Sequence, residues 1–116
     1  MSDRFAKLPD GECYAVIFSA QRTDGDNGYE ETAMRMDELA RDMPGYLGIE
    51  SARDAEGFGI TVAYWESEEA IRNWKRHPEH ARAQQSGREQ WYSDYRIRVA
   101  KVERAYGMTK RGDRTE

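Results

Sequence analysis

The sequence is poor in cysteine and proline and has no long apolar run, and each shortage excludes a class of protein. Its one cysteine, Cys13, cannot form a disulfide within the chain, which excludes a small scaffold held together by disulfides. The longest apolar run covers residues 13–18, far short of the roughly 20 residues that a membrane-spanning helix requires. We therefore expect a soluble protein without a membrane partner.

An excess of positive charge is also missing. The 18 basic and 22 acidic residues are mixed along the chain and give a net charge of −4. Without a positive field to hold a phosphate backbone, nucleic acid is not an expected partner. The first residues lack the apolar segment of a secretory signal, so we expect a cytoplasmic location.

The length of 116 residues is typical of one domain. We place this domain at residues 10–108, after an N-terminal tail of residues 1–9. Basic residues mixed with glycine and aspartate follow the last periodic segment, and this composition indicates a flexible, solvated C-terminal tail at residues 109–116.

Apolar residues alternate in four segments and recur at helical spacing between them. The alternation predicts strands at residues 13–21, 46–53, 58–66 and 95–106, with a short polar loop joining the second and third strands into a hairpin. The first helix is expected to begin after Asn27, which can cap it with Glu30 three residues on, and to stop before Pro44 and Gly45.

The second helical region carries both histidines of the chain. Ser67 is expected to cap its start, and Pro78 should break it near His77 because a residue before proline avoids helical geometry. Pro78 then suits the first turn of a further short helix, which Gly87 should end.

The last apolar run, residues 95–106, is about twice as long as a typical strand. Its apolar positions change sides near Val99, which predicts a bulge or a change of partner there. A strand longer than its own sheet leaves backbone groups unpaired, which favours a second chain that covers them. The apolar positions before and after the change are Tyr95, Ile97, Val99, Ala100, Val102 and Tyr106.

The order strand, helix, strand, strand, helix, strand predicts a ferredoxin-like α+β fold, βαββαβ, with an antiparallel sheet and helices on one face. The helices can cover only one face of the sheet. The other face includes apolar positions of the first and last strands, so we expect a second copy of the chain to bury it in a homodimer.

Several segments together resemble the antibiotic biosynthesis monooxygenase (ABM) superfamily over about residues 13–108. They are residues 15–18, 43–46, 62–70, 77–80 with Trp74 before them, and 94–102 continuing to Tyr106. The resemblance implies a dimeric ferredoxin-like α/β barrel. Members of the family oxidise aromatic polyketides with molecular oxygen and no prosthetic group, or cleave haem, or have no assigned reaction.

For the cofactor-free oxygenases, the resemblance implies a pocket between the sheet and the helices. Trp74 matches their tryptophan, His80 lies near the hydrogen-bonding aromatic that follows it, and Arg96 or Arg98 matches an arginine of the last strand. Ala70 stands where the pattern has an asparagine.

The chemistry expected is oxygenation of an electron-rich aromatic or quinol-type molecule by O2 without a cofactor. The protein then supplies a base, a donor for the developing anion and a dry cavity. We expect His80, Trp74 and Arg96 to be catalytic, with His80 or else His77 as the base, because histidine changes charge near neutral pH. Substrate-binding residues are expected to be Phe18, Tyr64, His77, Trp91 and Arg98.

Two other functions remain open. For a haem-binding or haem-degrading monooxygenase, the resemblance implies an iron ligand near Gln84, whereas His80 lies one turn earlier. A non-catalytic, stress-associated dimer that binds a small molecule would have much the same sequence. A metal site is not expected, because Pro78 interrupts the helix between His77 and His80.

The same residues also have purely structural interpretations. Trp74, Phe18, Tyr64 and Trp91 would then be core residues. His77 would cap the helix that begins at Pro78. Arg96 and Arg98 would form salt bridges across strands.

Overall fold

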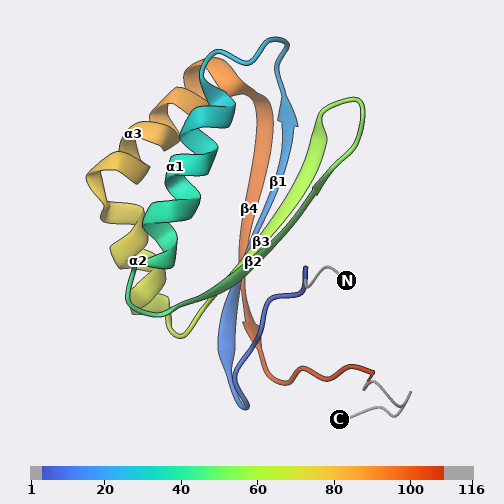
Figure 1. The fold of residues 1–116 in the computed structure, drawn as a ribbon, viewed down its shortest axis with the longest axis vertical. Coiled ribbons are helices and arrows are strands. Elements are labelled where there is room, and N and C mark those ends of the chain that lie inside the picture. Colours follow the sequence, from blue (N-terminus) through green and yellow to red (C-terminus); the bar gives the residue numbers. More distant parts are fainter. Residues whose placement is uncertain (1–3, 109–116) are drawn as a thin grey trace.

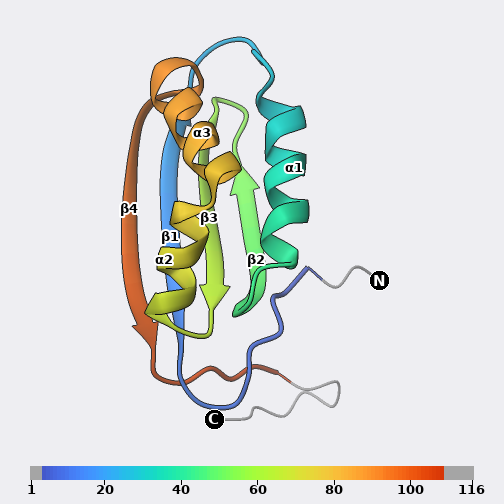
Figure 2. The ribbon, with the colours of Figure 1, turned by 90° about the vertical axis from the view of Figure 1, so that its left-hand side faces the viewer.

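The helices lie against one face of a single antiparallel sheet, and the other face is left without a helix (Figures 1 and 2). The computed structural model describes residues 4–108, to which all structural statements below refer. The predicted C-terminal tail, residues 109–116, lies outside the described residues, and the domain boundaries stay a prediction. The elements are β1 (Cys13–Arg22), α1 (Tyr29–Arg41), β2 (Tyr46–Arg53), β3 (Phe58–Trp65), α2 (Glu68–Arg76), α3 (Pro78–Ser86), a π-helical turn (Gly87–Trp91) and β4 (Tyr92–Val102).

The strand order is β2-β3-β1-β4, with β1 paired antiparallel to both β3 and β4. This arrangement confirms the ferredoxin-like α+β fold predicted from the sequence. In Figure 2 the helices lie in front of the sheet, with α1 at the β2 side, whereas β4 runs along the opposite edge. Within residues 4–108, no helix is both long and apolar enough to cross a membrane.

The predicted bulge near Val99 is wrong. From Asp94 to Val102, β4 pairs with β1 in one continuous register, and the shift lies at the other end of the pair, between Gln21 and Arg22. The strand also ends at Val102, which pairs with Cys13 at the start of β1, so the predicted extension of this strand beyond its own sheet is wrong.

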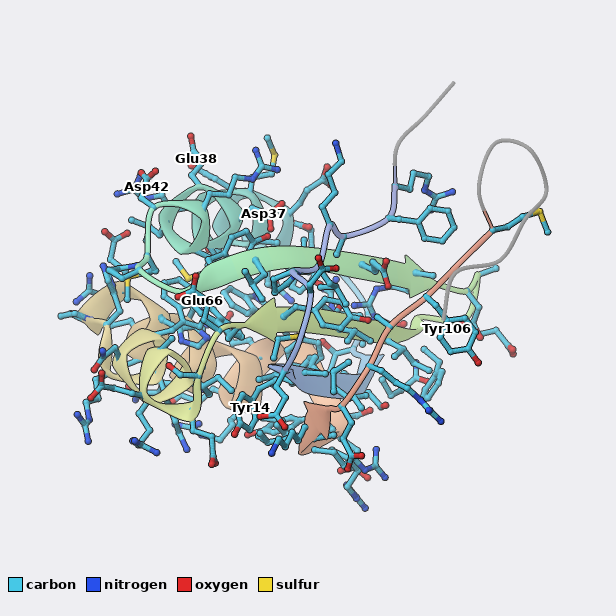
Figure 3. The ribbon with its side chains drawn as sticks, turned by 90° about the horizontal axis from the view of Figure 1, so that it is seen from below. Tyr14, Asp37, Glu38, Asp42, Glu66 and Tyr106 are labelled. Atoms are coloured by element: carbon cyan, nitrogen blue, oxygen red, sulfur yellow. The ribbon has the colours of Figure 1, made fainter. Side chains whose placement is uncertain are left out.

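The apolar positions therefore change sides along β4 without a bulge. Val99 faces the helix layer but is exposed at this edge of the sheet. On the other face, Val102 and Ala100 lie beside Cys13 and Ala15, which are buried. The chain continues past β4 on the side of the sheet away from the helices, where Figure 3 places Tyr106.

The start of α1 differs from the prediction. Asp26, not Asn27, accepts hydrogen bonds from the backbone N–H groups of Gly28 and Glu30. Asn27 has a left-handed backbone with φ of 49°, so its side chain does not cap the helix. The predicted cap of α2 is confirmed, because Ser67 Oγ accepts a hydrogen bond from Ala70 N at 3.1 Å.

Gly87 does not end the third helical segment. Its backbone is right-handed, and the chain continues through a π-helical turn to Trp91. This turn is held from outside the helix: the carbonyl of Trp91 accepts hydrogen bonds from Thr23 N at 2.9 Å and from Arg22 Nε at 3.0 Å. Tertiary contacts therefore override the helix-stopping tendency of glycine.

The core is built from small and aromatic side chains. Among the described residues, the buried apolar ones include no leucine, isoleucine or valine. They are Cys13, Ala15, Ala20, Ala40, Trp65, Ala70 and Trp91. Small residues allow close approach of backbones: a Cβ placed on Gly45 would lie 2.5 Å from the Cβ of Ala70, so the turn before β2 packs directly on α2.

A pair of glycine substitutions tests this contact. Gly45 and Gly28 both have φ above +80°, but the space beside Gly28 is empty to 4 Å. An alanine loses about 1–2 kcal/mol from the left-handed backbone at either position, and the clash at Gly45 adds about 1–3 kcal/mol. We therefore expect urea unfolding to show a larger loss of stability for Gly45→Ala than for Gly28→Ala. Equal losses would mean that the contact with Ala70 is not tight.

Candidate functional site

A column of stacked rings connects the sheet to both helices of the second helical region. Trp65, buried at the end of β3, stacks on Trp74 of α2 with ring centroids 6.2 Å apart. Trp74 in turn stacks on His80 of α3, at 4.2 Å and with only 10° between the planes. The imidazole is thus held flat against an indole whose position is fixed by the core.

The hydrogen bonding of His80 sets its tautomer. Its Nδ1 lies 3.0 Å from the carbonyl oxygen of Trp74, and because a carbonyl only accepts, Nδ1 carries the proton. Burial holds the pKa of His80 below its usual value of 6.5, although the bond to Trp74 acts in the opposite direction. Near neutral pH the ring is therefore uncharged, and Nε2 carries the lone pair that a general base needs.

His77 lies beside the same column but has a structural contact. Its ring centroid is 5.7 Å from that of Trp74, and its Nδ1 accepts a hydrogen bond from Glu79 N at 3.2 Å. This bond caps α3, as the structural interpretation of the sequence predicted. His77 therefore contributes to the start of the helix that carries His80.

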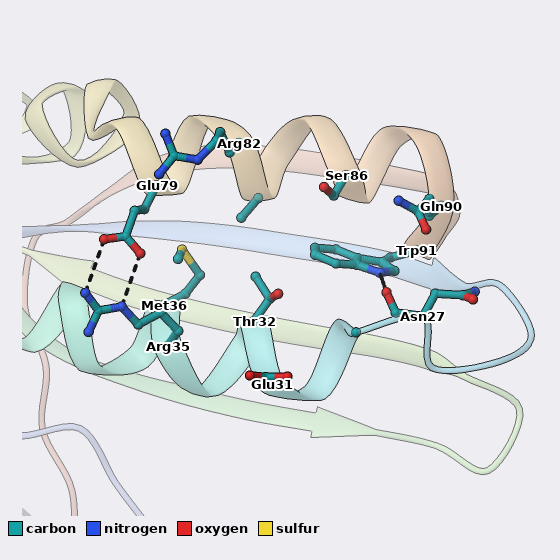
Figure 4. Close-up of a pocket in the computed structure, with 12 residues that line it drawn as sticks. Asn27, Glu31, Thr32, Arg35, Met36, Glu79, Arg82, Ser86, Gln90 and Trp91 are labelled. Atoms are coloured by element: carbon teal, nitrogen blue, oxygen red, sulfur yellow. Dashed lines mark hydrogen bonds and ion pairs between the residues drawn. The ribbon is translucent and has the colours of Figure 1, made fainter.

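A groove of about 410 Å³ separates α1 from α3 (Figure 4). Polar and charged side chains predominate in its lining. The lining residues are Asn27, Gly28, Glu31, Thr32, Arg35 and Met36 from the α1 side, and Glu79, Arg82, Ala83, Ser86, Gln90 and Trp91 from the other. His80 follows Glu79 directly, so it projects about 100° around α3 from the groove wall. The imidazole and the groove are therefore on neighbouring sides of the same helix.

An ion pair crosses the groove at one end. Arg35 donates from Nε to Glu79 Oε2 at 3.1 Å and from Nη2 to Glu79 Oε1 at 3.2 Å. Hydrogen bonding to Arg35 lowers the pKa of Glu79, and the same bond raises the pKa of Arg35. Both groups are partly exposed, so water and salt screen the pair and it contributes little to stability.

At the other end the groove is closed by Trp91. Its indole Nε1 donates to the carbonyl oxygen of Asn27 at 2.9 Å, and its ring meets that of Tyr29 edge to face. Arg22 lies over the ring of Tyr29, with its guanidinium carbon 3.6 Å from the ring centroid. Trp91 therefore ties the start of α1 to the π-helical turn.

The residues predicted for the site fall into three places. Trp74, His77 and His80 form the column described above. Phe18 and Trp91 belong to the aromatic group near the start of α1, where the ring centroids of Phe18 and Tyr92 are 5.2 Å apart.

The remaining three, Tyr64, Arg96 and Arg98, lie on the sheet face away from the helices. Successive residues of a strand alternate between the two faces of the sheet, and paired residues of neighbouring strands share a face. In the register with β1, Tyr64 pairs with Ala15, Arg96 with Ser19 and Arg98 with Ile17, so the three lie on one face. Arg96 forms an ion pair with Asp94, and Tyr64 donates a hydrogen bond to Glu50 at 3.4 Å. Within one chain the structure does not bring them together with His80.

The charged groove residues were not predicted from the sequence. Charged side chains of an amphipathic helix are usually exposed to solvent, so the sequence pattern does not mark Glu31 and Arg35 as site residues. A signal was present nonetheless: Thr32, Arg35 and Met36 recur at helical spacing, and so do Glu79, Arg82, Ala83 and Ser86.

Comparison of the sequence with known proteins identifies the family of this chain. The sequence profile described as "Antibiotic biosynthesis monooxygenase" matches residues 14–86, well over half of the chain. The chain belongs to the antibiotic biosynthesis monooxygenase family. It is also 53% identical over 104 residues to the uncharacterized protein YqjZ of Bacillus subtilis (strain 168), covering 90% of this chain and 91% of YqjZ. The two chains thus align over nearly their whole lengths.

Solved structures share the ABM fold at low sequence identity. SnoaB, a cofactor-independent oxygenase from Streptomyces nogalater, solved as the N63A mutant, aligns with a TM-score of 0.69 at 12% identity and covers 82% of this chain and 96% of SnoaB. A dimeric ferredoxin-like protein of unknown function from Thermobifida fusca aligns with a TM-score of 0.63 at 16% identity, over 85% of this chain and 98% of that protein. At these identities the likeness shows the fold alone.

The lowered pKa of His80 predicts a stability that depends on pH. Below about pH 6.5 the unfolded chain gains a proton at this position, whereas the buried ring in the folded protein resists protonation. The free energy of unfolding should therefore fall as the pH is lowered from 7.5 to 5.5, as measured by urea denaturation.

The variant His80→Gln should flatten this dependence. The carboxyl groups whose pKa values are lowered, Glu79 and Asp94, lose their stabilising charge only at lower pH, outside this window. An unchanged pH dependence in the variant would show that His80 is not the group responsible.

Proposed function

We propose that this ABM protein is a homodimeric, cofactor-independent monooxygenase that oxidises an electron-rich aromatic or quinol-type molecule with O2. The observation that carries the proposal is the neutral His80, whose Nδ1–H donates to the carbonyl of Trp74 and whose ring is stacked on Trp74. Family membership and the likeness in fold to a cofactor-independent oxygenase support the reaction class.

In the proposed reaction the substrate supplies the electrons. His80 Nε2 accepts the proton of a phenolic hydroxyl, and the resulting anion reacts with O2, because a phenolate releases an electron more readily than a phenol. With a hydroquinone, one oxygen atom enters the ring and the other leaves as water, giving a hydroxyquinone. The protein provides the base and fixes its orientation.

The other predicted site residues have different places in this proposal. The ring of Trp74 stacks on the base, and Phe18 and Trp91 belong to the aromatic group near the start of α1. Arg96 and Arg98 lie on the opposite sheet face, where they act on a substrate only if a second copy packs there.

The alternative of a haem-binding protein rests on the same histidine. An imidazole whose Nδ1–H is fixed by a backbone carbonyl presents Nε2 in the way that iron-ligating histidines do. A non-catalytic binding protein is the third possibility. Hemin titration and oxygen uptake distinguish the three.

Replacement of the base tests the oxygenase proposal. We expect His80→Gln to reduce oxygen uptake with a panel of hydroquinones by about 10²–10⁴-fold, the usual effect of losing a general base. For the wild type, the rate should fall as the pH drops below the lowered pKa of His80, because the protonated ring is no longer a base.

The control variant is Arg72→Gln, which introduces the same residue, glutamine, at an exposed position on α2. It should keep the wild-type rate. Undiminished turnover in His80→Gln would remove this histidine from the mechanism. A saturable Soret shift with hemin, lost in His80→Gln, would replace the oxygenase proposal by the haem alternative.

The homodimer is proposed from the face of the sheet that has no helix. Phe58 and Ile60, side by side with Ser19 and Gln21 on this face, are 45% and 44% exposed. Large apolar side chains on a sheet face are usually buried by another layer, and a second copy of the same face supplies one by two-fold symmetry. The ferredoxin-like protein from Thermobifida fusca that shares this fold is dimeric, which supports the assembly.

A charge placed on this face should separate the dimer. We expect Ile60→Lys to elute as a monomer in size-exclusion chromatography with light scattering, where the wild type is a dimer. The matched control is Met34→Lys, because Met34 is also exposed and apolar but lies on α1. A dimeric Ile60→Lys variant, or a monomeric wild type, would contradict the proposed interface.

A further inference from the structure

At one end of the groove the guanidinium group of Arg35 binds the carboxylate of Glu79, and the charge of Arg82 acts on this carboxylate from farther away (Figure 4). Arg35 reaches it from α1 with two parallel hydrogen bonds, and Arg82 lies one turn after it on α3. The charges of both arginines act on Glu79, since each lowers its pKa. The groove therefore contains a carboxylate-binding arrangement that is filled by a side chain of the protein itself.

This internal carboxylate is weakly held. The side chains of Arg35 and Glu79 are 51% and 34% exposed, so water can replace their contact. The planar fork of Arg35 fits any carboxylate in two-point contact. Arg82 has no ion pair of its own within 4.0 Å among residues 4–108, apart from its longer-range interaction with Glu79. An incoming carboxylate could thus exchange for Glu79 and gain a second cation.

The remainder of the groove suits a hydroxylated ring. Met36 and Ala83 supply apolar surface on the two walls, Thr32 and Ser86 supply hydroxyl groups, and Trp91 closes the far end. A volume of about 410 Å³ lies within the range of small-molecule sites.

We propose that the groove between α1 and α3 binds aromatic carboxylates, with the carboxylate of the ligand at Arg35 and Arg82 and its ring between Met36 and Trp91. Glu79 occupies the anion position when the ligand is absent. This site is separate from His80, which does not line the groove, so the inference does not depend on the proposed function.

The test compares two probes that differ only in the carboxylate. Anaerobic isothermal titration calorimetry is carried out with 2,5-dihydroxybenzoate and with hydroquinone. We expect the wild type to bind the acid about tenfold more tightly, and Arg82→Gln to lose about that factor for the acid alone, as loss of one charge-assisted contact predicts. Glu79→Gln should tighten binding of the acid, because it removes the competing carboxylate and releases Arg35.

The controls carry the same changes on α2, away from the groove: Arg72→Gln and Glu69→Gln should leave both affinities unchanged. Folding of each variant is checked by circular dichroism. If Glu79→Gln does not fold, Arg35→Lys replaces it, since it keeps the charge but loses the fork, and it should weaken binding of the acid.

The inference would be overturned if the wild type bound the two probes with equal affinity. It would also be overturned if Arg82→Gln bound the acid as tightly as the wild type does. Oxygen uptake separates this failure from failure of the proposed function. Selective binding of the acid without oxygen uptake would support the ligand class and contradict the oxygenase. Oxidation of hydroquinone without preference for the acid would support the oxygenase and contradict the ligand class.

Discussion

The candidate site depends on one stack of rings that begins in the core. Trp65 is buried between the sheet and the helices, and it fixes Trp74, against which His80 lies flat. The carbonyl of the same Trp74 also fixes the proton on Nδ1 of His80. One tryptophan thereby determines both the position and the tautomer of the imidazole, which links the packing of the domain directly to its acid–base chemistry.

Much of the fold could be predicted because it is encoded locally. For three of the four strands, the alternation of apolar residues predicts both ends to within a residue or two. The starts of α2 and α3 are marked by Ser67, whose side chain caps the helix, and by Pro78, whose ring suits the first turn. Predictions failed where distant contacts decide. The π-helical turn after Gly87 is held by Arg22 and Thr23, which lie more than sixty residues away in the sequence.

The candidate site was predictable only in part, for a related reason. Trp74 and His80 are close in the sequence, so their association needed only a helix break between them. By contrast, the face on which an arginine of β4 lies depends on which sheet face the helices cover. Because both faces of β1 are apolar, alternation alone did not assign Arg96 and Arg98 to the side away from His80. The ion pair of Arg35 and Glu79 joins positions 44 residues apart, which no local pattern reveals.

The groove itself is a consequence of how α1 is held. Near its C-terminal end, the small residues Gly45 and Ala70 bring the turn after α1 against α2, and near its start Trp91 binds Asn27. Between these two attachments the side chains that face α3 are mainly polar, so they leave a space instead of interdigitating as a dry core would. A core made of alanine and tryptophan fixes the ends of the helices and leaves the middle open. This is how a domain of this size can keep a stable fold and a cavity between its helices.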